Sequence, residues 1–238
     1  GQRMADLEQM LGFHAPEIPV LTLPGWDCLP YDRVSPGTDV SARRLAALSS
    51  LAAFPAHPHP AIVLTTANAI VQRLPPQEAI ASMTFSAKPG QVIRMEEIAS
   101  RLERNGFERT STVREVGEFA VRGGILDVFM PDTDQPMRLD FFGDTLESIK
   151  AFDVTTQRTT KGVQKLALMP VSEVAFGEEA EKLFRTRYVE LFGGATGDDP
   201  LYEAVSSGHR YPGQEHWLPL FHEHMETLLD YLPDVSIS

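Results

Sequence analysis

The fold is decided by residues 117–152, GEFAVRGGILDVFMPDTDQPMRLDFFGDTLESIKAF. Short runs in which apolar and polar residues alternate are separated here by Pro131-Asp132 and Gly143-Asp144, and Gly117-Glu118 separates the first of them from an upstream run. Turn residues between short alternating runs predict antiparallel strands with tight connections. We therefore expect an antiparallel meander, whose four strand-like runs are 110–116, 119–130, 137–142 and 145–152.

Two features complete this region. Residues 95–105 predict a helix with Ile98 and Leu102 on its apolar side, and Asn105-Gly106 is a typical helix stop. Gly123-Gly124 indicates a bulge or a close approach of another backbone segment. Residues 85–170 therefore predict a small α+β domain that contains an antiparallel sheet.

The flanking regions have a different pattern. Residues 1–84 alternate strand-like runs at 20–23 and 61–65 with helical patterns, which predicts a parallel α/β layer. Residues 171–238 predict helices at 178–191, 201–206 and 225–231, followed by an unfinished strand at 235–237. Because regular patterns are interrupted at both ends, we expect a fragment of a longer chain.

Composition limits the classes of function. The chain of 238 residues has a net charge of −12, whereas a protein that grips nucleic acid needs clustered Lys and Arg against the phosphates. Charge segregation would still permit such binding, but the balance argues against it. The single Cys28 and the lack of a long apolar run are typical of a protein in the reducing cytoplasm.

Motifs for catalysis or cofactor binding are missing. The sequence contains no Gly-x-x-x-x-Gly-Lys-[Ser/Thr] loop, and the glycine-rich stretch 193–199 is acidic. His222-Glu223-His224 and His57-Pro58-His59 lack the spacing of a zinc site, so we expect solvated histidines. We predict no catalytic residue, no cofactor and no metal in this chain.

The candidate functional residues come from strand alternation. In the run 137–142, Leu139 and Phe141 face one side, while Arg138, Asp140 and Phe142 share the other. Arg122 also points away from the predicted core. Arginine and aromatic residues on an exposed face are typical of a protein-docking surface.

Motifs along the chain carry a family resemblance. They are WDCLPYDRVSP at 26–36 with Asp39 and Arg43-Arg44, then GEFAVRGGILDVF at 117–129, and RLDFFGD at 138–144 with residues 147–149, 152–153 and 157–158. Together they resemble the amino-terminal, UvrB-like region of the transcription-repair coupling factors. UvrB itself carries a long tyrosine-rich hairpin after the first motif, whereas Tyr31 is the only tyrosine in that region of this chain.

The resemblance implies a fold and a partner. It implies a degenerate UvrB-like α/β domain without a nucleotide site, formed by residues 1–84 and 171–238, with residues 85–170 inserted as a domain that binds the damage-recognition protein UvrA. The family's interaction residues correspond by motif to Arg122, Arg138 and Phe142. The whole protein would be an ATP-dependent DNA translocase with ATP and Mg²⁺ in its motor domains. It would bind RNA polymerase and double-stranded DNA outside this fragment.

Two other interpretations remain open. One is a UvrB-like helicase module that binds damaged DNA. The other is a structural scaffold, in which Arg122, Arg138 and Phe142 are buried or internally paired, with Asp140 and Glu118 as partners of the arginines. We interpret Asp127 as a structural residue at a turn or a strand edge.

Overall fold

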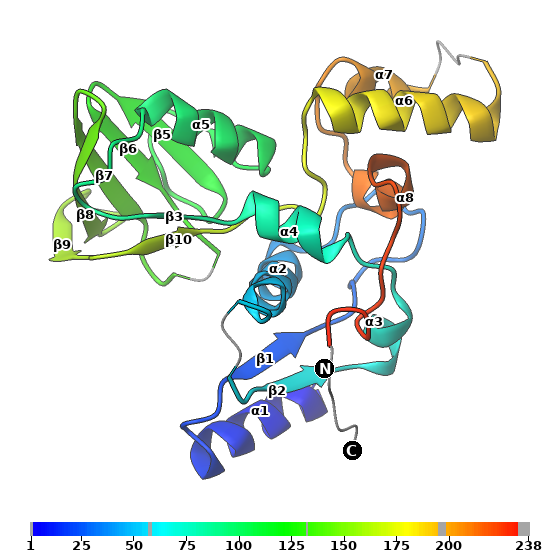
Figure 1. Ribbon diagram of the computed structural model, residues 1–238, viewed down its shortest axis with the longest axis horizontal. Coiled ribbons are helices and arrows are strands. Elements are labelled where there is room, and N and C mark those ends of the chain that lie inside the picture. Colours follow the sequence, from blue (N-terminus) through cyan, green and yellow to red (C-terminus); the bar gives the residue numbers. More distant parts are fainter. Residues whose placement is uncertain (1, 57–58, 132, 195–198, 233–238) are drawn as a thin grey trace.

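A computed structural model describes residues 2–56, 59–131, 133–194 and 199–232. The strands of these residues form three sheets (Figure 1): a parallel pair β1-β2, an antiparallel pair β10-β3, and a six-stranded sheet in the order β4-β5-β6-β7-β8-β9. The mixed α/β and α+β architecture that the sequence predicts is confirmed, including the antiparallel sheet.

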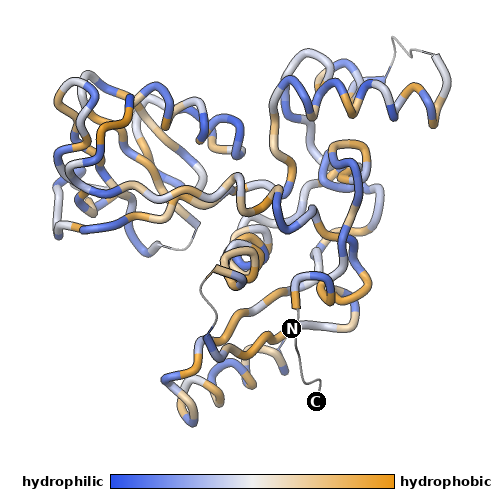
Figure 2. The backbone as a smooth tube through the Cα atoms, viewed as in Figure 1, coloured by the Kyte–Doolittle hydropathy of each residue, from blue (hydrophilic) through white to orange (hydrophobic). Residues whose placement is uncertain are grey.

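The first region forms a small α/β layer. Its elements are α1 (Gln2–His14), β1 (Val20–Leu23), α2 (Thr38–Ala53), β2 (Ile62–Thr65), α3 (Ala67–Val71) and α4 (Gln77–Met83). Strands β1 and β2 run parallel, as expected, and Figure 2 shows that both are hydrophobic along their length. The predicted stripe Leu45, Leu48 and Leu51 of α2 is buried in the same core cluster as Leu23.

The central region is the predicted meander with one helix on it. Its elements are β3 (Phe85–Ala87), α5 (Met95–Arg104), β4 (Glu108–Arg109), β5 (Glu118–Arg122), β6 (Ile125–Val128), β7 (Met137–Phe142), β8 (Thr145–Phe152), β9 (Thr159–Gly162) and β10 (Leu166–Leu168). Helix α5 places Ile98 and Leu102 in one core cluster with Leu126 and Leu139. It therefore covers one face of the six-stranded sheet.

Two strand predictions in this region need correction. The run 119–130 is a hairpin of β5 and β6, because Gly123 adopts φ of 59° and turns the chain. The predicted close approach is present next to it, since a Cβ at Gly124 would lie 2.8 Å from the Phe141 carbonyl oxygen. The run 110–116 is not a strand; only Glu108–Arg109 pairs with β5.

The last region consists mainly of helices that pack on one another. It contains α6 (Glu178–Phe192), α7 (Pro200–Ser206), the 3₁₀ helix η1 (Gln214–Trp217) and α8 (Leu218–Phe221). The helix predicted at 225–231 is wrong, because Thr227 donates from its backbone and its hydroxyl to Asp230 at 2.7 Å and forms a turn instead. The strand predicted at 235–237 lies outside the described residues.

The first and last regions share their interior. Leu228 and Tyr231 belong to the core cluster of Leu45, and Trp26 packs against the cluster around Phe184. A buried ion pair joins them as well, with Arg44 Nε 2.6 Å from Glu173 Oε1. The paired strands β3 and β10 connect this body to the six-stranded sheet (Figure 1).

Candidate functional site

The face of the six-stranded sheet opposite α5, here called the outer face, carries the residues predicted for partner binding. Cross-strand register aligns Arg122, Ile125, Asp140 and Ser148 in one row and Ala120, Asp127, Arg138 and Lys150 in the next. Residues aligned across strands point to the same side of a sheet. Arg122 and Arg138 therefore lie on the outer face, as alternation predicts.

Phe142 is the exposed apolar residue of the outer face. Its side chain is 77% exposed at the end of β7, directly before the turn residue Gly143 with φ of 56°. A register shift follows Asp140, because Asp140 pairs with Ser148 while Phe141 pairs with Leu146. The extra residue lies on β8, so the alternation along β7 is unbroken and Phe142 stays on the side of Arg138.

Asp127 connects the two arginines. Arg138 binds its carboxylate through two nitrogens, with Nε 2.7 Å from Oδ1 and Nη2 2.8 Å from Oδ2. Arg122 reaches the same Oδ2 with its Nη2 at 2.8 Å. The Asp127 side chain is fully buried, so these charge-assisted hydrogen bonds offset the cost of removing its charge from water.

The two arginines differ in accessibility. The Arg138 side chain is 15% exposed, lies over the Phe152 ring at 4.6 Å, and donates to the Gln157 carbonyl oxygen at 3.2 Å. The hydrogen bond to Asp127 raises the pKa of Arg138 above its ordinary value. The Arg122 side chain is 47% exposed. Arg122 and Phe142 are therefore the more available contacts for a partner.

A second ion pair lies beside Phe142. Asp140 accepts from the Ser148 hydroxyl at 2.6 Å and from Lys150 Nζ at 3.0 Å. Burial raises the pKa of the Asp140 carboxyl, but the bonds from Ser148 and Lys150 outweigh it and hold the pKa below its ordinary value. Asp140 is thus a carboxylate near neutral pH, and the outer face presents both signs of charge around an apolar side chain.

Comparison with known proteins identifies the region that carries this face. Residues 85–174 match the family described as the UvrB interaction domain. Transcription-repair-coupling factors are similar over most of the chain: that of Rickettsia typhi is 36% identical over 89% of it, that of Haemophilus influenzae 35% over 92%, and that of Escherichia coli 33% over 90%. The chain is homologous to a segment of the transcription-repair-coupling factors.

The resemblance seen in the motifs is therefore confirmed. The chain spans 18% to 19% of the length of these coupling factors. Arg122, Asp127, Arg138 and Phe142 all lie inside the part that matches the UvrB interaction domain.

The scaffold interpretation expected Asp140 and Glu118 to pair with the two arginines, and this is wrong. Asp140 binds Ser148 and Lys150, and the Glu118 carboxylate accepts from the backbone N–H groups of Arg114 and Glu115. The buried position of Asp127 in the interior strand β6 also contradicts its assignment to a turn or strand edge. The sequence did indicate a position within a strand, since Ile125 and Asp127 alternate with Leu126 and Val128.

The scaffold interpretation holds for the two arginines but not for Phe142. It requires Arg122, Arg138 and Phe142 to be buried or paired internally, and both arginines do have Asp127 as partner. Phe142 does not meet the requirement, because three quarters of its side chain faces solvent at 77% exposure. An exposed phenylalanine beside an ordered pair of arginines is a feature that internal packing does not explain.

Histidines and acids form no metal cluster in the part of the chain that the structure describes. The expectation of solvated histidines is wrong for His222, which is 8% exposed, and burial lowers its pKa. His224 is exposed and lies 3.5 Å from a Glu226 carboxylate oxygen. His57, and residues 195–198 of the glycine-rich stretch, lie outside the described residues.

No helix in the described ranges is long and apolar enough to cross a lipid bilayer.

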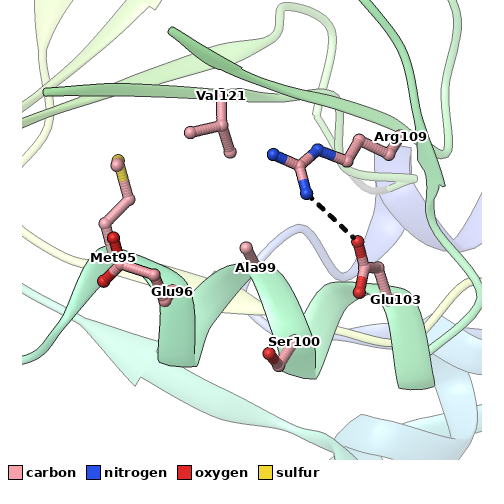
Figure 3. A pocket seen from close by; sticks show the side chains of 7 residues that line it. All are labelled: Met95, Glu96, Ala99, Ser100, Glu103, Arg109 and Val121. Atoms are coloured by element: carbon pink, nitrogen blue, oxygen red, sulfur yellow. Dashed lines mark ion pairs between the residues drawn. The ribbon is translucent and has the colours of Figure 1, made fainter. Parts of the chain in front are cut away.

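Two cavities lie elsewhere on the described residues, and neither has the features of a phosphate site. A groove of about 180 Å³ lies between α5 and β5, below the roughly 300 Å³ of typical ligand pockets. Figure 3 shows Arg109 pointing across it to Glu103, 3.7 Å away. A wider cleft of about 760 Å³ is lined by Arg33 and Arg210 but also by four glutamates, which disfavour phosphate: Glu108, Glu115, Glu118 and Glu215.

Proposed function

We propose that this chain is an adaptor module of a transcription-repair coupling factor, and that its outer face binds UvrA. By that contact the module would recruit nucleotide excision repair to RNA polymerase stalled at a DNA lesion. The observation that carries the proposal is the exposed Phe142 beside the ordered Arg122–Asp127–Arg138 network. Its location within a match to the UvrB interaction domain supports UvrA as the partner.

The proposed contact uses three residues in two ways. Phe142 is the apolar anchor that enters a pocket on UvrA, since buried aromatic side chains dominate the energy of many interfaces. Arg122 and Arg138 supply positive charge to carboxylates of UvrA through charge-assisted hydrogen bonds. Because Arg138 is only 15% exposed, Arg122 makes the more direct of the two contacts.

The domain division is part of the proposal. Residues 85–170 form the UvrA-binding domain, and residues 1–84 and 171–238 together form the UvrB-like α/β domain. The hydrophobic clusters support this, because Leu23 and Tyr231 share one cluster, while buried residues between Ala87 and Met169 form another. We assign no catalysis or nucleotide binding to this chain.

The remaining activities belong to the longer protein. We propose that it is cytoplasmic and that it displaces RNA polymerase as an ATP-dependent translocase on double-stranded DNA. ATP, Mg²⁺, the polymerase and the DNA would then be bound by parts outside these 238 residues. The support is the homology to coupling factors, of which this chain is a minor part.

Phe142→Ala is expected to weaken binding of this chain to UvrA by about 30-fold, because truncation of an aromatic anchor typically costs about 2 kcal/mol. The melting temperature should not change, since Phe142 is 77% exposed. Isothermal calorimetry against purified UvrA measures the affinity.

The matched control for this experiment is Phe13→Ala, which removes an aromatic side chain of similar exposure, 80%, from α1. Figure 1 shows α1 far from the six-stranded sheet. The Phe13 variant should bind UvrA like the unmodified chain. Equal affinity of the Phe142 variant and the unmodified chain would remove Phe142 from the site, and absence of UvrA binding by the unmodified chain would overturn the proposed function.

A further inference from the structure

Asp127 lies on β6, between two strands that each supply one arginine. Arg122 comes from β5 on one side and Arg138 from β7 on the other, and both meet the carboxylate on β6. Asp127 itself is fully buried and makes no contact with solvent. A partner protein on the outer face therefore cannot reach Asp127 directly, and any role of this residue in binding must act through the arginines.

The two arginines use the carboxylate unequally. Arg138 occupies both oxygens through Nε and Nη2, whereas Arg122 uses one nitrogen, Nη2, on Oδ2. Among the described residues, nothing else accepts a hydrogen bond from Arg122, so its Nε and Nη1 N–H groups remain available. One edge of the Arg122 guanidinium is thus fixed to the sheet, and the 47% exposed remainder faces outward.

Fixing an arginine before binding has a thermodynamic consequence. A free arginine side chain loses rotamer entropy when a partner immobilises it, and this loss opposes association. An arginine whose guanidinium is already held by an internal carboxylate loses less rotamer entropy on binding. Because the two arginines outnumber the single aspartate, the network also keeps one net positive charge, which suits a carboxylate on the partner.

We propose that Asp127 is a positioning residue of the UvrA-binding face: it holds Arg122 so that the free edge of the guanidinium meets an acidic side chain of UvrA. This inference rests on the proposed function and deepens it. Asp127 cannot touch UvrA, so it contributes to the affinity for UvrA indirectly, by holding Arg122 in place.

A double-mutant cycle tests the coupling. The affinities for UvrA of Asp127→Asn, Arg122→Ala and the double variant are measured by calorimetry, with thermal unfolding of each variant alongside. Each single substitution should weaken binding by about 10-fold. The double variant should be weaker than Arg122→Ala by no more than about 2-fold, because Asp127 has then lost the more exposed of the two arginines through which it acts.

Other outcomes of the cycle are informative. Additive losses, about 100-fold in the double variant, would overturn the inference, as would unmodified affinity in a folded Asp127→Asn chain. If Arg122→Ala itself binds like the unmodified chain, the proposed site fails rather than the inference alone.

A second variant keeps the inference testable if Asp127→Asn does not fold. Arg122→Lys retains the positive charge on an exposed side chain, but an ammonium cannot keep the Asp127 contact and present a planar fork outward. The inference predicts a loss close to that of Arg122→Ala. Binding of Arg122→Lys as tight as that of the unmodified chain would show that charge alone suffices and would overturn the inference.

Discussion

Arg44→Ala is expected to lower the free energy of unfolding by about 4 kcal/mol, the largest effect of any single substitution considered for this chain. The Arg44 side chain is fully buried, and its Nε and Nη2 lie 2.6 and 3.3 Å from the two oxygens of Glu173, which is 4% exposed. Arg44 also donates to the Pro24 carbonyl oxygen at 2.7 Å. Its removal leaves Glu173 as a buried charge that has lost its ion-pair partner.

The neighbouring arginine provides the control. Arg43 lies on the same helix but is 51% exposed, and it pairs with the exposed Asp39 at 3.3 Å. Exposed pairs of this kind contribute about 0 to 1 kcal/mol, so Arg43→Ala should be close to neutral. Chemical denaturation of both variants measures the difference. A loss below about 1 kcal/mol for Arg44→Ala would contradict the view that this ion pair holds the first and last regions together.

Arg138→Ala is expected to lower the free energy of unfolding by about 3 kcal/mol. The reason is again a buried carboxylate, because Arg138 supplies two of the three hydrogen bonds that Asp127 receives from the arginines. Arg122 remains as a partner, so we expect the lower end of the range for a broken buried pair. Thermal and denaturant unfolding measure the effect.

Arg109→Ala is the matched control for Arg138→Ala. Arg109 belongs to the same sheet, but its side chain is 59% exposed and its contact with Glu103 is 3.7 Å long. Its removal should change stability by less than about 1 kcal/mol. If Arg138→Ala proved as harmless as this control, the Asp127 network would not be a structural element of the sheet. Because Arg138 affects folding, any loss of UvrA binding in its variants has to be read beside their stability.

The sequence predicts the outer face well for a physical reason. Side chains alternate along a strand, so Arg138, Asp140 and Phe142 had to share one side of β7 if that strand was unbroken. It is unbroken, because the extra residue at the register shift falls on β8. Local turn chemistry likewise predicted the turn at Gly143-Asp144 between β7 and β8. It did not predict the hairpin turn at Gly123 and Gly124, where the run 119–130 indicated a single strand.

The pairing of side chains could not be predicted in the same way. Asp127 meets Arg122 and Arg138 only because the register of three strands aligns them, and register depends on turn geometry that alternation does not specify. Arg44 and Glu173 are separated by 129 residues along the chain. At residues 225–231 a local competitor decided the structure, since the Asp230 carboxylate captures the N–H and hydroxyl of Thr227.

The most direct test of the proposed function is the affinity of the chain for purified UvrA by isothermal calorimetry, with Arg122→Ala and Arg109→Ala beside the unmodified protein. Both arginines are about half exposed, at 47% and 59% of their side chains, but Arg122 lies on the outer face and Arg109 lines the groove against α5. The unmodified chain and Arg109→Ala should bind equally. Arg122→Ala should bind at least 10-fold more weakly, since it loses a charge-assisted hydrogen bond to UvrA. Its melting temperature should fall less than that of Arg138→Ala, because Arg138 still pairs with both oxygens of Asp127. Equal affinity of all three proteins, or equal weakening by both substitutions, would contradict a UvrA site on the outer face.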